Sequence, residues 1–193
     1  LVHVLNAALG NAGHGVAYLP MEMPGLGDLK DLTADLNSGR IHTLVILGGN
    51  PVYSAPVDLK FGQALQKAGT SIHVSHNLDA TSSQCTWHIP RAHYLESWGD
   101  AVAWDSTLMS VQPLIAPLFG GKTLTEVMSA IIDGSPRTSY QIARDTFNGG
   151  TAAPENDDRF EKRWRAFIHS GFLKGSGKAQ GQPLALAGAS IKP

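Results

Sequence analysis

Thr43-Leu44-Val45-Ile46-Leu47-Gly48-Gly49-Asn50-Pro51 is the segment that decides the fold of this chain. Its run of aliphatic residues from Leu44 to Leu47 predicts a strand buried on both faces, in the middle of a parallel sheet covered by helices. Two glycines end this strand, and Asn50 and Pro51 turn the chain away from the sheet. A doubly wound sheet binds its ligand at the carboxyl ends of its strands. We therefore expect any binding site to lie beside this turn, although a plain strand-to-loop exit explains the same residues.

The segments on either side of this strand alternate between helical and extended patterns. We expect a helix from Asp28, as its N-cap, to about Asn37 and another from Leu59 to about Ala68, capped by Asp58. Further strands are expected at Ser71–Ser75 and Trp87–Pro90. A strand, a helix and a strand within about thirty residues form a crossover unit of parallel strands. The fold class is therefore predicted to be α/β, with a Rossmann-like, mostly parallel sheet flanked by helices.

The remaining segments carry weaker patterns. We expect a helix at Val2–Leu9, a short strand at Val16–Leu19, an irregular aromatic-rich stretch at 94–105, a long extended passage marked by Gln112-Pro113 and Pro117, a helix capped by the Thr123-Leu124-Thr125-Glu126 box, and C-terminal helices at Tyr140–Phe147 and around Phe160–Ile168. The expected organisation is one α/β domain over residues 1–172, followed by a flexible tail or linker over residues 173–193.

Length and charge exclude several classes of function. The chain has 193 residues, enough for one α/β domain with a tail, and a net charge of −1. That charge provides no basic field, so we expect no nucleic-acid partner. No apolar run approaches the ~20 residues needed to cross a bilayer, so we expect no direct membrane insertion. The sequence begins at Leu1 rather than Met, and we expect it to be part of a longer polypeptide.

Metal-binding patterns are weak. Cys85 is the single cysteine, so neither an intrachain disulfide nor a Cys-x-x-Cys cluster motif is possible. The densest group of histidines consists of His73, His76, His88 and His93. Their spacing does not match a zinc site, and we expect no metal in this chain.

Two polar turns are the candidate binding residues. The backbone N–H groups of Gly48-Gly49 and the Asn50 amide could face a phosphate or a purine edge, although no helix is expected directly after this turn. Asp79, Thr81 and Ser82 follow the next strand, where they could meet a ribose or a base. The alternative is a local Asx or Ser/Thr turn, which these residues form readily and which is favoured on spacing alone.

The order of the motifs points to a known family. They are Leu47-Gly48-Gly49-Asn50-Pro51, the strand at Val74, Thr81, Ile89-Pro90, and Leu95-Glu96 followed by Gly99-Asp100. This order, over roughly residues 1–117, resembles the molybdopterin oxidoreductase (dimethyl sulfoxide reductase) family. The resemblance implies a Rossmann-like domain that grips the guanosine diphosphate arm of a molybdopterin guanine dinucleotide. By position, the implied dinucleotide contacts are Gly48, Gly49, Asn50, Pro51, Asp79 and Thr81.

The family motifs are altered at several places. Ala80-Thr81-Ser82 replaces an acidic-Thr-Ala triplet, Cys85-Thr86 replaces Ala-Asp, and Asp100 replaces Thr. Loss of these polar partners would leave a dinucleotide poorly held. We therefore expect no cofactor in this chain, and molybdopterin guanine dinucleotide only if the family site is intact.

The sequence of residues 94–100 and 110–118 is similar to that of one branch of the family, the fused molybdopterin-like/iron–sulfur subunit of the bacterial alternative complex III. This resemblance implies a respiratory subunit in quinol oxidation, peripheral on the periplasmic face of the inner membrane. Its implied partners are the other subunits of the membrane-bound complex and the remaining domains of the parent chain, which would carry the iron–sulfur clusters. The fragment itself would be structural and would catalyse nothing alone.

Two other interpretations remain. One is a domain that binds molybdopterin guanine dinucleotide within an active molybdenum oxidoreductase whose metal ligand lies elsewhere. The other is an unrelated nucleotide-binding α/β domain, such as a middle domain of a thiamine-type enzyme. That domain would have a nucleotide pocket at 48–51, without the Gln112-Pro113 passage packing back on the sheet.

Overall fold

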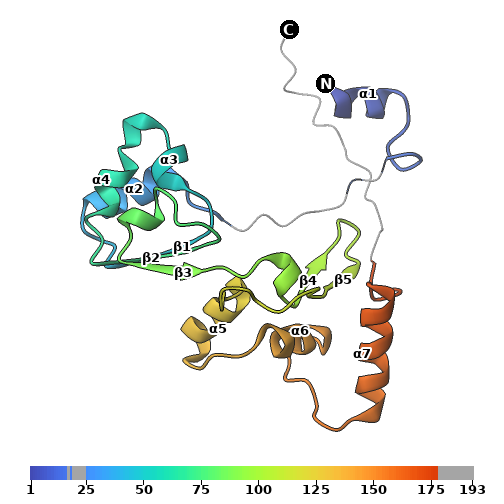
Figure 1. Cartoon of the computed structure of the whole chain (residues 1–193). Helices are drawn as coiled ribbons and strands as arrows, with labels where there is room; N and C mark the ends of the chain where they lie inside the picture. Colours follow the sequence, from blue (N-terminus) through green and yellow to red (C-terminus); the bar gives the residue numbers. More distant parts are fainter. Residues whose placement is uncertain (17, 19–24, 178–193) are drawn as a thin grey trace.

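A three-stranded parallel sheet, a two-stranded antiparallel sheet and seven helices form the part of the chain that the computed structural model describes, residues 1–16, 18 and 25–177 (Figure 1). In chain order the elements are α1 (Val2–Ala8), α2 (Leu29–Asn37), β1 (Thr43–Leu47), α3 (Pro51–Ser54), the 3-10 turn η1 (Val57–Leu59), α4 (Phe61–Leu65), β2 (Thr70–Ser75), η2 (Ser82–Gln84), β3 (Trp87–Pro90), η3 (Tyr94–Glu96), β4 (Gly99–Val102), β5 (Leu108–Val111), α5 (Leu124–Asp133), α6 (Ser139–Phe147) and α7 (Asp158–Ser170). The α/β fold class is confirmed.

The parallel sheet has the order β1-β2-β3, so its neighbours in space are also neighbours in sequence. Val45 pairs with Ile72, and Val74 pairs with Ile89. The strand at the aliphatic run is confirmed, but its predicted place in the middle of the sheet is wrong. Among the described residues no strand pairs with the outer side of β1, and its residues are half-buried or exposed. An aliphatic run predicts that a strand forms, but the position of that strand in the sheet depends on partner strands elsewhere in the chain.

Helices α2 and α4 cover one face of this sheet. Leu36, Phe61 and Leu65 are buried there, and Leu44 and Ile46 of β1 pack against them. Asp28 is the predicted N-cap of α2, and its Oδ1 accepts a hydrogen bond from the Asp31 N–H at 2.7 Å. Since successive strand residues point to opposite faces, the alternate residues of each strand are left for the second face.

The segment between β1 and β2 differs from the expected single helix. The one-turn helix α3 begins directly after Asn50, because Pro51 presets a helical backbone at its first position. Asp58 lies within η1 and does not cap the next helix. Lys60 then adopts a left-handed conformation, with φ of 49°, so α4 begins only at Phe61. The predicted helix from Leu59 to Ala68 is therefore wrong at both ends.

The second half of the chain has its own core. Strands β4 and β5 form an antiparallel hairpin. The first of them lies in the stretch 94–105 that was expected to be irregular, and no element was predicted for the residues of the second. Helices α6 and α7 pack their aromatic faces together, and Trp164 is 2% exposed at the centre of this cluster. The expected capping box is present at α5, with Thr123 and Glu126 bonding each other's backbone N–H groups.

The passage after Gln112 packs back on the parallel sheet. The Lys122 N–H donates to the Pro90 carbonyl at 2.9 Å, and the Ala92 N–H donates to the Lys122 carbonyl at the same distance. Leu114 also donates its N–H to the Leu95 carbonyl at 2.7 Å. The two halves of the described chain are thus joined at the carboxyl end of β3.

The ends of the chain are described in part. Of the strand expected at Val16–Leu19, residues 17 and 19 lie outside the described residues, as does most of the expected tail. Of that tail, Leu173 donates its N–H to the Leu108 carbonyl at 2.8 Å, which attaches the start of the segment to β5. Within the described ranges, none of the helices combines the length and apolarity that a bilayer span requires.

Candidate functional site

Two polar turns meet at the carboxyl edge of the sheet, as the parallel arrangement of β1 and β2 requires. Thr81 is fully buried. Its hydroxyl donates to the Asn50 Oδ1 at 2.8 Å and accepts from the Val52 N–H at 3.0 Å. The Thr81 N–H also donates to the Asn50 Oδ1, at 3.2 Å. The structure therefore brings Asn50 and Thr81, two of the six residues assigned by position, into direct contact.

Buried His73 of β2 links the same two turns from beneath. Its Nε2 lies 3.0 Å from the Gly49 carbonyl oxygen, and its Nδ1 lies 2.8 Å from the Ser82 Oγ. From the sequence, this histidine is recognisable only as a weak metal candidate, and its bridging role is not apparent. The available signal was a polar side chain between the aliphatic residues Ile72 and Val74, on the face opposite to them.

Asp79 forms its hydrogen bonds within the second turn. Its Oδ1 accepts from the Ser82 N–H at 2.9 Å and lies 3.6 Å from the His73 Nδ1. Partial desolvation opposes ionisation, but the hydrogen bonds from Ser82 and the nearby His73 outweigh it and hold the pKa of Asp79 below its ordinary value. This is the local Asx-type turn that the sequence allowed as the alternative to a ligand contact.

The glycine at position 48 leaves room for the Arg91 guanidinium, whereas the space beside Gly49 is open. Gly48 and Gly49 have φ of 80° and 71°, a region that favours glycine. The Arg91 guanidinium, from the end of β3, lies 3.3 Å from the place that a Cβ on Gly48 would take. Among the described residues no carboxylate forms an ion pair with Arg91. This edge could therefore attract an anion.

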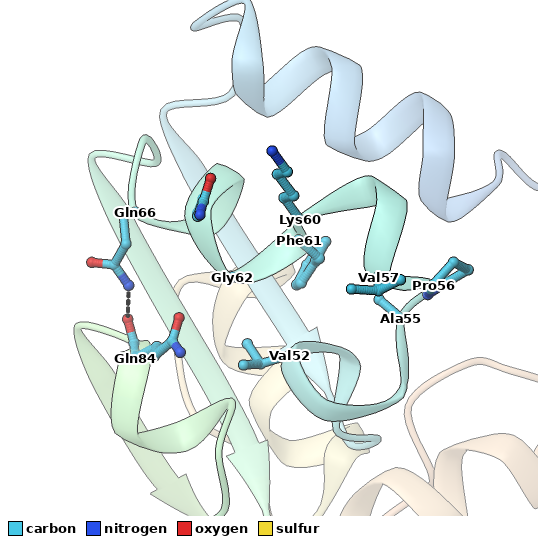
Figure 2. Close-up of a pocket in the computed structure, with 10 residues that line it drawn as sticks. Val52, Ala55, Pro56, Val57, Lys60, Phe61, Gly62, Gln66 and Gln84 are labelled. Atoms are coloured by element: carbon cyan, nitrogen blue, oxygen red, sulfur yellow. Dashed lines mark hydrogen bonds between the residues drawn. The ribbon is translucent and has the colours of Figure 1, made fainter.

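A cavity of about 480 Å³ lies on the helical side of these turns, between α3, η1, α4 and η2 (Figure 2). Val52 and Phe61 give it an apolar floor, and Gln66 donates from its Nε2 to the Gln84 carbonyl at 3.0 Å across one side. None of the six residues assigned by position lines this cavity. The polar turns and the cavity are neighbours that share the Val52 segment.

The four histidines form pairs rather than a cluster. The ring centroids of His73 and His88 are 6.3 Å apart, and those of His76 and His93 are 5.6 Å apart. In the described part of the chain, no three side chains of the His, Cys, Asp or Glu type are arranged to hold a metal ion.

No protein-family model matches this chain, and no curated protein matches it. The function is therefore inferred from the ordered motifs and from the geometry of the sheet edge.

Proposed function

We propose that this chain is a structural part of a molybdopterin oxidoreductase-like iron–sulfur subunit in a respiratory complex that oxidises quinol. In this proposal it holds no molybdenum cofactor and catalyses nothing alone. The remaining domains of the parent chain carry the iron–sulfur clusters. Other subunits hold the assembly at the periplasmic face of the inner membrane, as in the alternative complex III branch that the sequence resembles.

The observation that carries this proposal is the mutual hydrogen bonding of the two turns. The side chains of Asn50, Asp79 and Thr81, which family position assigns to the dinucleotide, bond to the protein itself. A dinucleotide that recruited them would have to replace those bonds, at about 0.5–1.5 kcal/mol for each neutral one. The turns are thus suited to joining two strands rather than to holding a ligand.

The path of the chain after Gln112 also supports the family interpretation. Its return to the end of β3, through the Arg91–Lys122 bridge, is a feature that an unrelated nucleotide-binding domain was not expected to have. The position of β1 at the sheet edge counts against the family interpretation, because that interpretation expects a covered strand in the middle of the sheet.

A binding measurement tests the cofactor part of the proposal. We expect titration of the purified chain with molybdopterin guanine dinucleotide to give no heat signal at micromolar concentrations. Saturable micromolar binding that Arg91→Ala weakens would contradict the proposal and favour the second interpretation, a cofactor-binding domain. The specific observation for that alternative is Arg91 beside Gly48, which has no carboxylate partner among the described residues and where a pyrophosphate could lie.

Isolation of the parent polypeptide from its native membranes tests the respiratory part. After mild detergent extraction, we expect it to co-purify with partner subunits and with quinol-oxidising activity. Recovery as a free protein, with the activity in other fractions, would contradict the assignment.

A further inference from the structure

The second face of the parallel sheet borders an apolar cavity. Each strand contributes one side chain to its floor, namely Val45 of β1, Ile72 of β2 and Ile89 of β3. Helix α5 forms the facing wall, to which it contributes Val127 and Ile131. The cavity measures about 510 Å³, within the ~300–1,000 Å³ range of small-molecule sites.

The charged residues that line this cavity favour neither an anion nor a cation. Lys122 and Glu126 carry opposite charges. Arg137 already faces two carboxylates, Asp145 at 2.7 Å and Asp133 at 3.3 Å. A charged ligand would therefore meet groups of both signs at the cavity, and its charge would gain little there.

Other polar groups of the lining already have hydrogen-bond partners. The two carboxylate oxygens of Glu126 accept from the Thr123 N–H at 3.0 Å and from the Ser139 N–H at 2.8 Å. The Thr138 hydroxyl donates to the Gln141 Oε1 at 3.0 Å. A buried water needs two to four polar partners, and an apolar cavity instead takes up molecules such as benzene. The lining thus suits a molecule that needs no hydrogen bond.

Contacts outside the cavity hold its helical wall in place. Glu126 of α5 accepts from the N–H of Ser139, the first residue of α6. Arg137, which lies between these helices, pairs with Asp133 of α5 and with Asp145 of α6. The cavity is therefore formed by the fold itself, as small-molecule sites usually are.

A polypeptide segment fits this cavity poorly. The strands form their hydrogen bonds in the plane of the sheet, and α5 forms its own along the helix axis. The backbone groups of an extended segment lying between them would have no partners, and each such buried group costs free energy. A helix satisfies its own backbone, but it is about 10–12 Å across, so about one to two turns would fill the cavity, too few for a stable helix.

We propose that this cavity binds an uncharged, apolar small molecule, packed between Ile72 of the sheet and Ile131 of α5. Burial of the apolar surface of the ligand supplies the affinity. A charged group on the ligand would lose hydration without gaining a partner of one consistent sign. This inference goes beyond the proposed respiratory role and does not depend on it.

Three probes with the same ring system test the class of ligand. We expect naphthalene to shift the methyl NMR signals of Ile72 and Ile89, while the signal of Ile168, in the aromatic core around Trp164, stays in place. Naphthoate and naphthylmethylammonium should each bind about tenfold more weakly, because their charge loses hydration. Binding of either ion as tight as that of naphthalene would overturn the assignment to an uncharged ligand. Naphthalene that leaves the Ile72 and Ile89 signals unchanged, or shifts Ile168 equally, would overturn the site.

A matched pair of substitutions on α5 tests the apolar wall. Ile131 lines the cavity and is 55% exposed, so Ile131→Asp should leave the chain folded and weaken naphthalene binding about tenfold, since it puts a carboxylate against the ring. Ile132→Asp is the control, because Ile132 is 73% exposed on the same helix and does not line the cavity. Equal naphthalene affinity in the two variants, with native circular dichroism, would contradict the site.

Filling the cavity provides a test without a new charge. Ala130 lines the cavity from an exposed position on α5, so Ala130→Phe should abolish the naphthalene shifts of Ile72 and Ile89 while the circular dichroism stays native. Naphthalene binding that persists unchanged in this variant would place the ligand elsewhere and overturn the proposal.

Discussion

The Thr81 hydroxyl has two partners, the Asn50 Oδ1 and the Val52 N–H. Thr81→Val keeps the shape of the side chain but leaves the half-buried Val52 backbone N–H without its hydrogen-bond acceptor. We expect the free energy of unfolding, measured with urea, to fall by about 1–3 kcal/mol. Thr81→Ser retains the hydroxyl and should lose less. Wild-type stability in Thr81→Val would show that the two turns do not depend on this residue.

The Asp79 carboxylate makes the stability of the folded chain depend on pH. Desolvation alone would raise its pKa, but the Ser82 hydrogen bonds and the nearby His73 together outweigh it and hold the pKa in the folded chain below the ordinary value of 3.8. The carboxylate therefore stabilises the fold above about pH 4, and this contribution is lost as the pH falls through the folded pKa. The stability difference between the wild type and Asp79→Asn should be largest at neutral pH and shrink toward pH 3. Urea titrations between pH 3 and pH 7 measure this difference in the free energy of unfolding. A difference that stays constant over that range would contradict the role of the Asp79 carboxylate.

At the scale of elements, the contact between the returning passage and β3 depends on the absence of a side chain at Gly121. A Cβ there would lie 2.8 Å from the Ala92 backbone nitrogen and 3.0 Å from the Ala92 Cα. Because backbone atoms cannot rotate away, Gly121→Ala should destabilise the chain by about 1–3 kcal/mol. Gly27→Ala is the control, since a Cβ at Gly27 meets no atom within 4 Å. Equal stabilities of the two variants in thermal unfolding would show that the contact between the returning passage and β3 does not depend on Gly121.

Elements set by local signals could be predicted from the sequence, and elements set by distant partners could not. The caps at Asp28 and Thr123 are recognisable because the side chain and the N–H it accepts lie three residues apart. The β4–β5 hairpin was missed, since its outer strand is completed far along the chain, where the Ser110 N–H donates to the Gly171 carbonyl. The left-handed Lys60, which divides the crossover helix, follows from no local glycine or asparagine preference.

At the scale of the whole molecule, the same distinction applies to the candidate site. The meeting of Asn50 and Thr81 follows from two adjacent parallel strands, and the sequence predicted it. The bridging role of His73 did not follow, because its partners belong to two turns that only the fold brings together. The edge position of β1 was not predictable either, as an aliphatic run looks alike in a middle strand and in an edge strand.

That edge position has a consequence for the behaviour of the isolated chain. In a parallel pair, alternate residues direct both backbone groups toward the partner strand. The Gly48 N–H donates to the Val74 carbonyl at 2.9 Å, so the backbone groups of Thr43, Val45 and Leu47 point away from β2. An uncharged, aliphatic edge with free backbone groups is a template for pairing with other chains.

We therefore expect the isolated chain to self-associate through β1 as its concentration rises. Leu47→Lys should raise the concentration needed about tenfold, because a charge on an edge strand opposes pairing, and this change corresponds to ~1.4 kcal/mol. Light scattering after size-exclusion chromatography measures the effect. Leu78→Lys is the matched control, since Leu78 is 74% exposed and lies outside the strands. Equal suppression of association by both variants would point to general surface charge, whereas suppression by Leu47→Lys alone assigns the association to the β1 edge.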